Sequence, residues 1–453
     1  MHPTLTFPQR VGIGLRALVA PMALPLLALR ALQVRGDTLR RQRRGDKPRL
    51  VFGPTPIINI KYIRQAVERL GYTAATVVYQ PSIIHTRGDY DHYLFELVKL
   101  PLPAWLYKRL MSIWGPYLGL FWLLSRFDIF HFYFDGGFLA GTPLRFWEVW
   151  LLHLAGKKVI VTPYGSDCAV NTQTHSLLWR QGLLMQYRDL GAHERETLRQ
   201  IDYFSRNADF IVAVMVHLET LPVWDMLTTL YYPIDTDAWP ACQDYSPHDG
   251  RTGPVVVVHA PNHRGVKGTE FLIQACRELQ AEGLQVELRL LERVPNTEVR
   301  RILSQADILA DQFFQGFALA ALEGMALAKP VMSNLADDRL YLLHRLYTGL
   351  DECPILSTPV TAIKDNLRRL VTDPALRQRL GLAGRQYVLK FHSYATMGRM
   401  WHLVYRKLWH GEPLDLAIWH PDRFPDEGQR ETATSGSSSG VMPHERGAAN
   451  TND

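Results

Sequence analysis

Two cations of one short loop, Arg264 and Lys267, have the chemistry to neutralise a phosphate group. The loop leaves an apolar run, Val255–His259, and enters a helical pattern, Thr269–Gln280. A guanidinium holds two phosphate oxygens at once, an ammonium adds a point charge, and glycines such as Gly265 allow close backbone approach. Free N–H groups at the start of a helix also favour an anion. The segment predicts a phosphate site, and a solvated basic loop is the alternative.

The second candidate is a carboxylate, Glu323, which is the single acid of the apolar helical stretch Ala318–Leu327. Such a helix is expected to be buried, and a buried carboxylate needs a partner. The two hydroxyls of a ribose diol would supply two hydrogen-bond donors. A backbone N–H or an arginine is the structural alternative.

A framework of parallel strands is expected to position these residues. Short apolar runs alternate with helix-period stretches in two series, which predicts an α/β protein of two doubly wound domains facing each other across a cleft. Ligands of open α/β sheets bind at the carboxyl ends of the strands. The expected strands are Leu50–Phe52, Ala75–Tyr79, Ile129–Phe132, Val159–Thr162 and Phe210–Ala213, then Val255–His259, Val286–Leu291, Ile308–Ala310 and Pro330–Ser333.

The same patterns predict the domain organisation. An apolar and basic N-terminal segment precedes a first domain, a turn-rich linker separates it from a second domain, and one long amphipathic helix (Arg385–Trp409) packs back across both. The last residues lack periodic apolar positions and are expected to form a disordered tail. The predicted ranges are 1–48, 49–230, 231–253, 254–384, 385–412 and 413–453, in that order.

Composition excludes several classes of protein. The chain has 453 residues, 47% of them hydrophobic and 21% charged, which is typical of a folded protein with more than one core. Four scattered cysteines without a CxxC pair argue against structural zinc and favour a reducing, cytoplasmic setting. The first fifty residues contain ten Lys and Arg against two Asp, or +8, so the rest of the chain carries −2. A nucleic-acid-binding body is therefore not expected.

The basic N-terminal segment is predicted to lie at a membrane interface. Its uncharged run, Ala17–Leu29, has 13 residues, whereas a spanning helix needs about 20. Arginines meeting anionic lipid favour an interfacial anchor, and a helix packed on the protein's own body is the alternative. A second apolar stretch, Leu110–Leu124, suits either a membrane interface or a buried helix pair equally well.

The stretch QGFALAALEGMALAKPV, Gln315 to Val331, resembles the pattern EGFGxxxxEAMAxGKPV of the retaining glycosyltransferases of family 4, which have the GT-B fold of two Rossmann-like domains. The basic loop before the Lys267-Gly268 pair, the linker Ile234–Trp239 and the turn Gly165-Ser166-Asp167 are similar to further motifs of that family. The resemblance spans residues 49–410.

By this resemblance, the second domain holds a nucleoside-diphosphate sugar. Arg264 and Lys267 then neutralise the leaving diphosphate as the catalytic residues, and Glu323 binds the ribose. The remaining donor-binding residues implied are Gly265, Gln315, Gly316, Phe317 and Ala318.

The first domain would supply acceptor or sugar contacts. The candidates are Gly53, His131, Tyr164 and Asp167, although a packed histidine is an equal alternative at His131. This chain departs from the family pattern at three positions that concern the sugar end of the site, since it has Gln315 for a glutamate, Ala318 for a glycine and Tyr164 for a histidine. Members of the family usually need no metal, and no cofactor besides the donor is expected.

The expected function is therefore transfer of a hexosyl group, with retention and without metal, to a lipid-linked or surface-glycan acceptor at the cytoplasmic face of a membrane. The expected partners are the nucleotide sugar, the acceptor and an anionic membrane surface. A catalytically silent sugar-nucleotide-binding or scaffold protein is the alternative that Gln315 and Tyr164 motivate. A dinucleotide-dependent oxidoreductase is not expected, because no glycine fingerprint lies between a strand and a helix.

Overall fold

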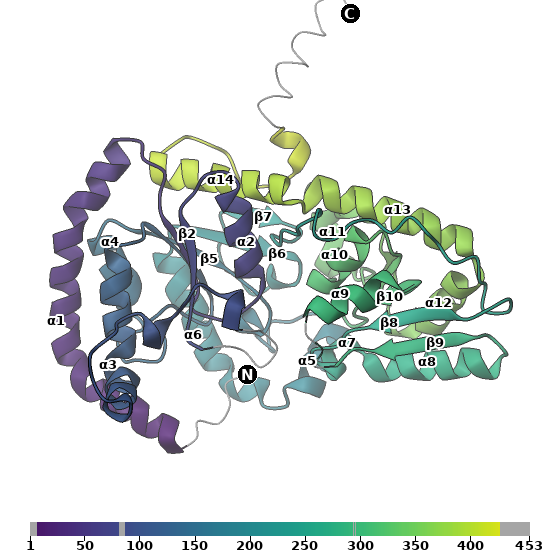
Figure 1. Ribbon diagram of the computed structural model, residues 1–453, viewed down its shortest axis with the longest axis horizontal. Helices are drawn as coiled ribbons and strands as arrows, with labels where there is room; N and C mark the ends of the chain where they lie inside the picture. The colour runs from purple at the N-terminus through teal and green to yellow at the C-terminus, as the bar shows by residue number, and fades with distance from the viewer. Residues whose placement is uncertain (1–6, 81–86, 293, 295, 426–453) are drawn as a thin grey trace, which may run out of the picture.

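The computed structural model describes residues 7–80, 87–292, 294 and 296–425, which form two lobes side by side along the long axis of the molecule (Figure 1). Each lobe is built on one parallel sheet. The prediction of two doubly wound α/β domains is confirmed by these sheets and by the helices on both of their faces.

The first lobe has a seven-stranded sheet of order β3-β2-β1-β4-β5-β6-β7. One face packs on α1, α3, α4 and α6, and the other packs on α2 and α14. The strands are β1 Leu50–Phe52, β2 Ala74–Val78, β3 His92–Tyr93, β4 Ile129–Tyr133, β5 Lys158–Thr162, β6 Phe210–Val214 and β7 Met226–Thr228. The helices are α1 Phe7–Arg43, α2 Asn59–Glu68, α3 Ala104–Leu124, α4 Glu148–Leu154, α5 Leu177–Gln186 and α6 Glu194–Asn207.

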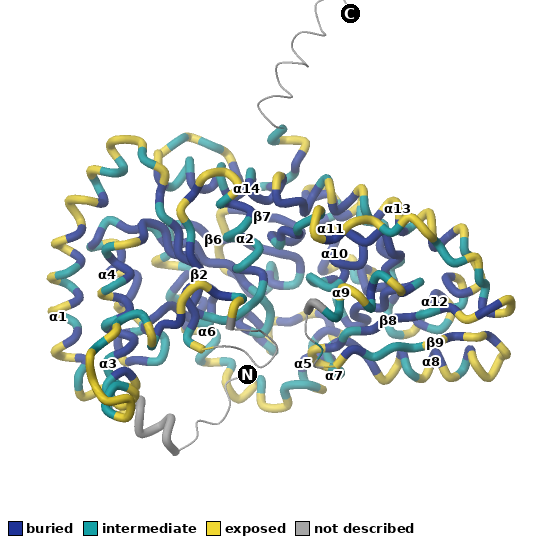
Figure 2. The backbone as a smooth tube through the Cα atoms, viewed as in Figure 1, coloured by how far each residue is buried: buried dark blue, intermediate teal, exposed yellow. Residues whose placement is uncertain are grey.

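The second lobe has a five-stranded sheet of order β12-β11-β10-β8-β9. The strands are β8 Val255–His259, β9 Val286–Leu290, β10 Ile308–Ala310, β11 Val331–Ser333 and β12 Leu356–Ser357. The helices are α7 Arg264–Lys267, α8 Thr269–Ala281, α9 Asn296–Ser304, α10 Leu319–Ala326, α11 Asp338–Tyr347, α12 Ile363–Thr372 and α13 Pro374–Phe391. Most strands of the two sheets are dark blue in Figure 2, because helices cover them, whereas the edge strands β9 and β12 are largely half-buried.

The single helix expected over Arg385–Trp409 is wrong. The structure has α13 in the second lobe and α14, Tyr394–His410, on the first, and the two run along the top of the molecule (Figure 1). The break lies at His392 and Ser393, where the carbonyl of His392 accepts a hydrogen bond from the linker residue Ile234 and the Ser393 hydroxyl caps α14. Both contacts come from the tertiary fold, and the helical period of the sequence does not show them.

The disordered tail expected over 413–453 is also wrong for its first part. Residues 413–425 are described, and they pack along the edge of the first sheet, where Leu227 exchanges backbone hydrogen bonds with Ala417 and Trp419. Leu416 and Trp419 are buried there, so a few apolar side chains are sufficient to order the segment. Residues 426–453 lie outside the described residues.

One face of α1 belongs to the core of the first lobe, as the alternative interpretation of the N-terminal segment expects. The buried residues recur every three or four positions: Ala20, Ala23, Leu27, Ala31 and Val34. They pack against α3 and α4, and α3 contains the second apolar stretch of the sequence. The opposite face of α1 is exposed (Figure 2).

Candidate functional site

The predicted phosphate loop lies at the carboxyl end of β8 and forms the short helix α7, which is followed directly by α8. Gly268 joins the two helices with a φ of 71°, a left-handed conformation that favours glycine. Its N–H donates to the carbonyl of Gly265, while its own carbonyl accepts from Leu272 in the first turn of α8. The loop therefore reverses sharply and holds Lys267 against the strand ends.

A buried ion pair is the centre of this site. The ammonium of Lys267 lies 2.6 Å from a carboxylate oxygen of Asp311, which directly follows β10, and the Asp311 side chain is fully buried. The other oxygen of Asp311 accepts the N–H of Ala318, 3.1 Å away, at the start of α10. Asp311 thus joins the basic loop to the helix that carries Glu323. Asp311 was not predicted from the sequence, although its place as the first residue after a buried strand is a usable signal.

Glu323 is buried beside this pair. Its side chain makes no hydrogen bond and no ion pair with any residue that the structure describes, and the residue is only 5% exposed. Burial raises the pKa of its carboxyl group to about 8, while Lys267 opposes this shift and Asp311 adds to it. The fold therefore brings Lys267 and Glu323 into electrostatic contact and leaves the carboxyl group without a hydrogen-bond or ion-pair partner among the described residues.

Arg264 is placed differently. It is partly exposed at the outer rim, where its guanidinium lies 2.8 Å from Glu270 and 3.0 Å from Glu292. These carboxylates hold the pKa of Arg264 above its usual value. Lys267 is paired with the buried Asp311 instead, so the two predicted cations have different partners in this structure.

The turn before α10 contributes less backbone to the site than expected. Gly316 has a φ of 49°, but its N–H donates to the Tyr341 hydroxyl at 2.5 Å and its carbonyl accepts from the Ser333 hydroxyl. Phe317 is buried in the core of the second lobe, so it does not offer its ring to a ligand. The side-chain oxygen of Gln315 is buried without a hydrogen-bond partner among the described residues.

A second cluster of polar groups lies at the carboxyl ends of β1, β4 and β5 in the first lobe. The carboxylate of Asp135 accepts hydrogen bonds from the hydroxyls of Thr55, at 2.8 and 2.9 Å, and Tyr164, at 3.3 Å. Asp167 is buried and accepts the backbone N–H groups of Phe134, Tyr164 and Gly165. Asp135 and Thr55 are only half-buried, so this cluster reaches the surface.

The two aspartates have raised pKa values. Burial raises the pKa of Asp135 to about 6, against the hydrogen bonds from Thr55 and Tyr164. Burial raises the pKa of Asp167 to about 7, and the neighbouring Asp135 adds to the shift. Tyr164 and Asp167 were predicted from the sequence, whereas Asp135 and Thr55 were missed because each follows its strand by two or three residues without a recognisable motif.

Two further predicted contacts belong to the core. His131 is buried, its ring lies against Trp401, and its Nε2 is 3.0 Å from the hydroxyl of Tyr405 on α14. The expectation that His131 faces the cleft is therefore wrong, and the packed alternative holds. Gly53 is buried too, since a Cβ there would lie 1.9 Å from the carbonyl oxygen of Val77. Its role is close backbone packing beside β2.

The two lobes meet at the phosphate loop. Helix α5 of the first lobe packs on α7, and the side-chain oxygen of Gln186 accepts the N–H of Gly265 at 3.3 Å. On the same helix, Gly182 is so close to Phe314 that a Cβ would lie 2.9 Å from its ring. A second contact is made by Met215, which follows β6 and lies near Gly316. The carboxyl ends of both sheets therefore face one another.

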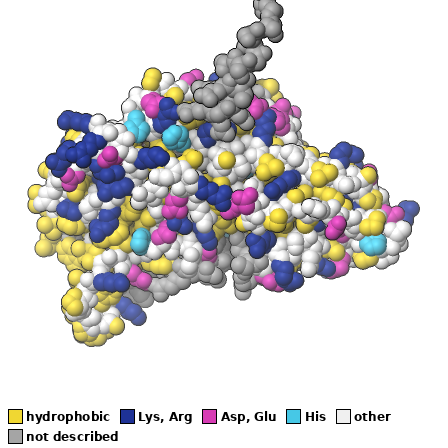
Figure 3. All heavy atoms as spheres, turned by 45° about the horizontal axis from the view of Figure 1, so that its top comes forward, with side chains coloured by type: hydrophobic (Ala, Val, Ile, Leu, Met, Phe, Trp, Pro, Cys, Tyr) yellow, Lys and Arg dark blue, Asp and Glu magenta, His cyan; other side chains and the backbone are white. Residues whose placement is uncertain are grey.

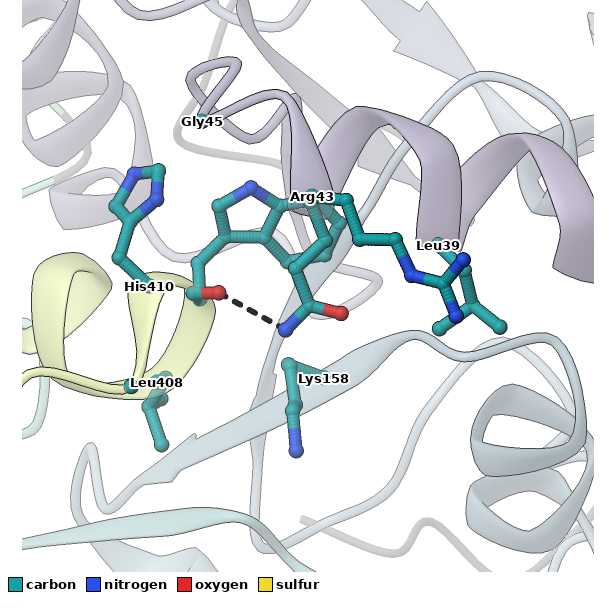
Figure 4. A pocket seen from close by; sticks show the side chains of 9 residues that line it. Leu39, Arg43, Gly45, Lys158, Leu408 and His410 are labelled. Carbon is teal, nitrogen blue, oxygen red and sulfur yellow. Dashed lines mark hydrogen bonds between the residues drawn. The ribbon is translucent and has the colours of Figure 1, made fainter.

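One cavity lies elsewhere, between the end of α1, β5 and the end of α14, with a volume of about 460 Å³ (Figure 4). Its three basic side chains, Arg43, Lys158 and His410, point in different directions (Figure 4). Lys158 is also paired with Asp209 at 2.8 Å. This cavity therefore does not gather charge around one anion.

One group of side chains has metal-ligand chemistry among the described residues, namely Glu352, His420 and Asp422. The ammonium of Lys390 lies 2.8 Å from both carboxylates. A cation of the protein therefore already neutralises the group, which ties residues 413–425 to α13. It is a structural ion network far along the chain from the site above.

No family model matches the chain. The MMP alpha-(1->4)-mannosyltransferase of Mycolicibacterium hassiacum is 25% identical over 191 residues, which are 36% of this chain and 45% of that enzyme. The chain thus matches less than half the length of this relative. Among solved structures, a glycosyltransferase from Rickettsia africae aligns with 80% of this chain and 98% of its own at 12% identity and a TM-score of 0.45. The Thermobaculum terrenum O-GlcNAc transferase aligns with 81% and 68%, at 15% identity and a TM-score of 0.42.

Proposed function

We propose that this chain is a glycosyltransferase that moves a hexosyl group from a nucleoside-diphosphate sugar to an acceptor at the cytoplasmic face of a membrane. The observation that carries the proposal is the buried, unpartnered carboxyl group of Glu323 beside the Lys267–Asp311 pair. A buried carboxyl group with no partner among the described residues is costly, so its presence favours a ligand that supplies hydrogen-bond donors. The partial match to a mannosyltransferase supports a hexosyl donor.

In the donor site, Lys267 stabilises the charge that develops on the leaving diphosphate as the bond between the anomeric carbon and the diphosphate oxygen breaks. One well-placed group of this kind contributes about 3–4 kcal/mol to catalysis. Glu323 binds the ribose diol, and the unpartnered oxygen of Gln315 is available to a sugar hydroxyl. Arg264 reaches the diphosphate by exchanging Glu270 and Glu292 for phosphate oxygens. Retention and independence from metal rest on the family resemblance alone.

In the acceptor site, the cluster of Asp135, Thr55 and Tyr164 binds the hydroxyl that attacks the anomeric carbon. A carboxylate with a pKa of about 6 accepts hydrogen bonds at neutral pH and can take the proton that this hydroxyl releases. The acceptor is lipid-linked or a growing surface glycan, because the apolar and basic N-terminal segment favours an anionic membrane surface as partner.

Asp135→Asn should lower kcat about 100-fold or more and leave donor affinity unchanged, because it removes the proton acceptor and keeps the shape of the side chain. In the unmodified protein, kcat should rise as pH increases through about 6, where Asp135 loses its proton. A pH profile of kcat measures both effects. Asp225→Asn is the control, since Asp225 is an exposed aspartate of the same lobe whose carboxylate accepts the N–H of Ile211. Unchanged kcat in Asp135→Asn would remove Asp135 from the mechanism.

A silent nucleotide-sugar-binding protein is the second candidate. It is favoured by the contact between Gln186 and Gly265, which occupies an N–H of the phosphate loop, and by Gln315 in place of a glutamate. A thermal-shift screen of nucleotide sugars identifies the donor, because a bound ligand stabilises the folded state by mass action. Slow release of nucleoside diphosphate from that donor then supports the enzyme. Donor binding without hydrolysis or transfer to any acceptor supports the silent protein.

A further inference from the structure

The outward face of α1 is unusually apolar for a helix on a protein surface. Five large side chains recur every three or four residues along it, so that they form one row on one face: Leu18, Met22, Leu26, Leu29 and Leu32. They are between 53% and 75% exposed. A contiguous exposed row of this kind marks an interaction surface. We call it the α1 row.

The helices that pack on α1 carry exposed aromatic side chains. Trp147 directly precedes α4, and Trp150 lies in its first turn. Helix α4 packs against α1, and both tryptophans are nearly half exposed. At the start of α3, which also packs on α1, Trp105 is 69% exposed. Tryptophan is enriched where an apolar phase meets water, so these rings fit a bilayer surface.

Cations lie at both ends of the α1 row. Arg40, Arg43 and Arg44 are exposed at the end of α1, and Figure 3 shows basic side chains gathered beside the hydrophobic ones at this end of the molecule. Two acids lie nearby, and each is paired, Asp37 with Arg40 and Asp46 with Arg41. Lys108 and Arg109 are exposed on the first turns of α3, near the other end.

The inner face shows how α1 is attached. By length and composition alone, α1 has a segment, Gly14–Arg43, that is long and apolar enough to cross a membrane. However, the Arg16 guanidinium donates to the carbonyls of Ser112 and Gly141, at 2.9 and 3.0 Å. Further along, Arg35 donates to Leu154 and Gln42 to Trp409. A helix that spans a bilayer would lose all of these contacts, together with its buried alanines.

We propose that the flank formed by α1, α3 and the start of α4 docks on an anionic lipid bilayer, with α1 lying in the plane of the surface. The α1 row enters the boundary between headgroups and acyl chains, the tryptophans lie at the same level, and the arginines and lysines at the two ends meet anionic headgroups. The proposal deepens the membrane partner of the proposed function. The second lobe lies at the opposite end of the molecule from α1, so it stays in water (Figure 1).

A second copy of the chain is the competing occupant, and the charges disfavour it. An isologous contact through this face pairs the two helices across a two-fold axis. Antiparallel pairing would bring the arginines of one α1 against the lysine and arginine of the partner's α3, and parallel pairing would bring like ends together. Both arrangements oppose cation clusters, whereas an anionic surface attracts them all.

Vesicle flotation of the full chain tests the proposal. The protein should float with vesicles of phosphatidylcholine containing about 30% phosphatidylglycerol, and much less with phosphatidylcholine alone. The double variant Leu26→Glu and Leu29→Glu should reduce the bound fraction about tenfold or more, because two inserted side chains become charged. Leu346→Glu is the matched control, since Leu346 is 63% exposed on α11 of the second lobe, and it should float like the unmodified protein.

Three outcomes would overturn the proposal. Equal flotation of the double variant and its control excludes the α1 row as the docking face. Retention of the protein in membranes after alkaline carbonate extraction shows a spanning α1. A concentration-dependent dimer that the double variant abolishes, without vesicle binding, assigns the face to a second copy. Donor binding measured by thermal shift should be the same in all three proteins, so a failure here is distinguishable from a failure of the proposed function.

Deletion of the N-terminal segment is not a suitable test. The buried face of α1, from Ala20 to Val34, is part of the core of the first lobe, so its removal would expose that core and cause aggregation whatever the role of the outer face. The exposed positions of the α1 row avoid this ambiguity. Circular dichroism of the variants should be unchanged.

Discussion

Glu323→Gln should make the empty protein more stable and the donor complex weaker. Burial favours the neutral form of this carboxyl group and raises its pKa from 4.5 to about 8. The free energy of unfolding is therefore highest below about pH 4.5, where the group is neutral in both states. It falls as pH rises from there through about 8, because the unfolded state loses the proton first. Glutamine is neutral at every pH, so the variant has no ionised side chain to bury at this position. At pH 8.5 or so, the variant should unfold with a free energy about 2 kcal/mol higher than that of the unmodified protein.

Donor affinity should change in the opposite direction. Two ribose hydroxyls form stronger hydrogen bonds to an ionised carboxylate than to a single amide oxygen. The donor should therefore bind about 10- to 100-fold more weakly to Glu323→Gln. In the unmodified protein, affinity should increase with pH up to about 8, because the bound diol favours the ionised form. The variant should lose this dependence. Calorimetric titration over a pH series measures both effects, and an unaltered affinity would make Glu323 a purely structural residue.

Lys267→Met should abolish most of the donor turnover and also destabilise the second lobe. It removes the ammonium that faces the leaving diphosphate, which predicts a loss of about 100- to 1000-fold in release of nucleoside diphosphate. It also leaves the fully buried carboxylate of Asp311 without its counter-charge, at a cost of about 3–5 kcal/mol. Turnover and thermal unfolding of the same preparation measure the two effects.

The double variant Lys267→Met and Asp311→Asn separates the two roles of the lysine. The amide at position 311 keeps an oxygen for the N–H of Ala318 and carries no charge, so most of the lost stability should return. Turnover should not return, because no cation faces the diphosphate. Recovery of both properties in the double variant would show that Lys267 only supports the fold.

Local sequence was sufficient to predict those elements of the second lobe whose structure follows from the pattern of a single segment. The β-branched run Val255–His259 and the short run Ile308–Ala310 form strands with the predicted limits, because both are central strands covered on two faces. Lys267 and Glu323 were found because a cation in a loop before a helix and an acid in an apolar helix are conspicuous against their neighbours.

Residues whose role depends on distant segments were missed or assigned the wrong role. Asp311 becomes significant only when β10 lies beside β8, which brings the aspartate to Lys267. His131 has the position of a strand-end residue, but α14 covers it through Tyr405, which lies 274 residues later. Sequence periodicity contains no information on such contacts, because it reports the environment of a face and not the identity of the segment that covers it.

Helix α14 has a consequence for how the protein is made. The second core of the first lobe contains Met400, Trp401, Val404, Tyr405 and Trp409, while the cores of the second lobe use no residue beyond Phe391. During synthesis, the later lobe therefore has all its parts before the earlier one is complete. The nascent chain emerges with this face of its first sheet covered only by α2 until α14 leaves the ribosome, and the partly covered sheet is the stage at which a chaperone is most needed.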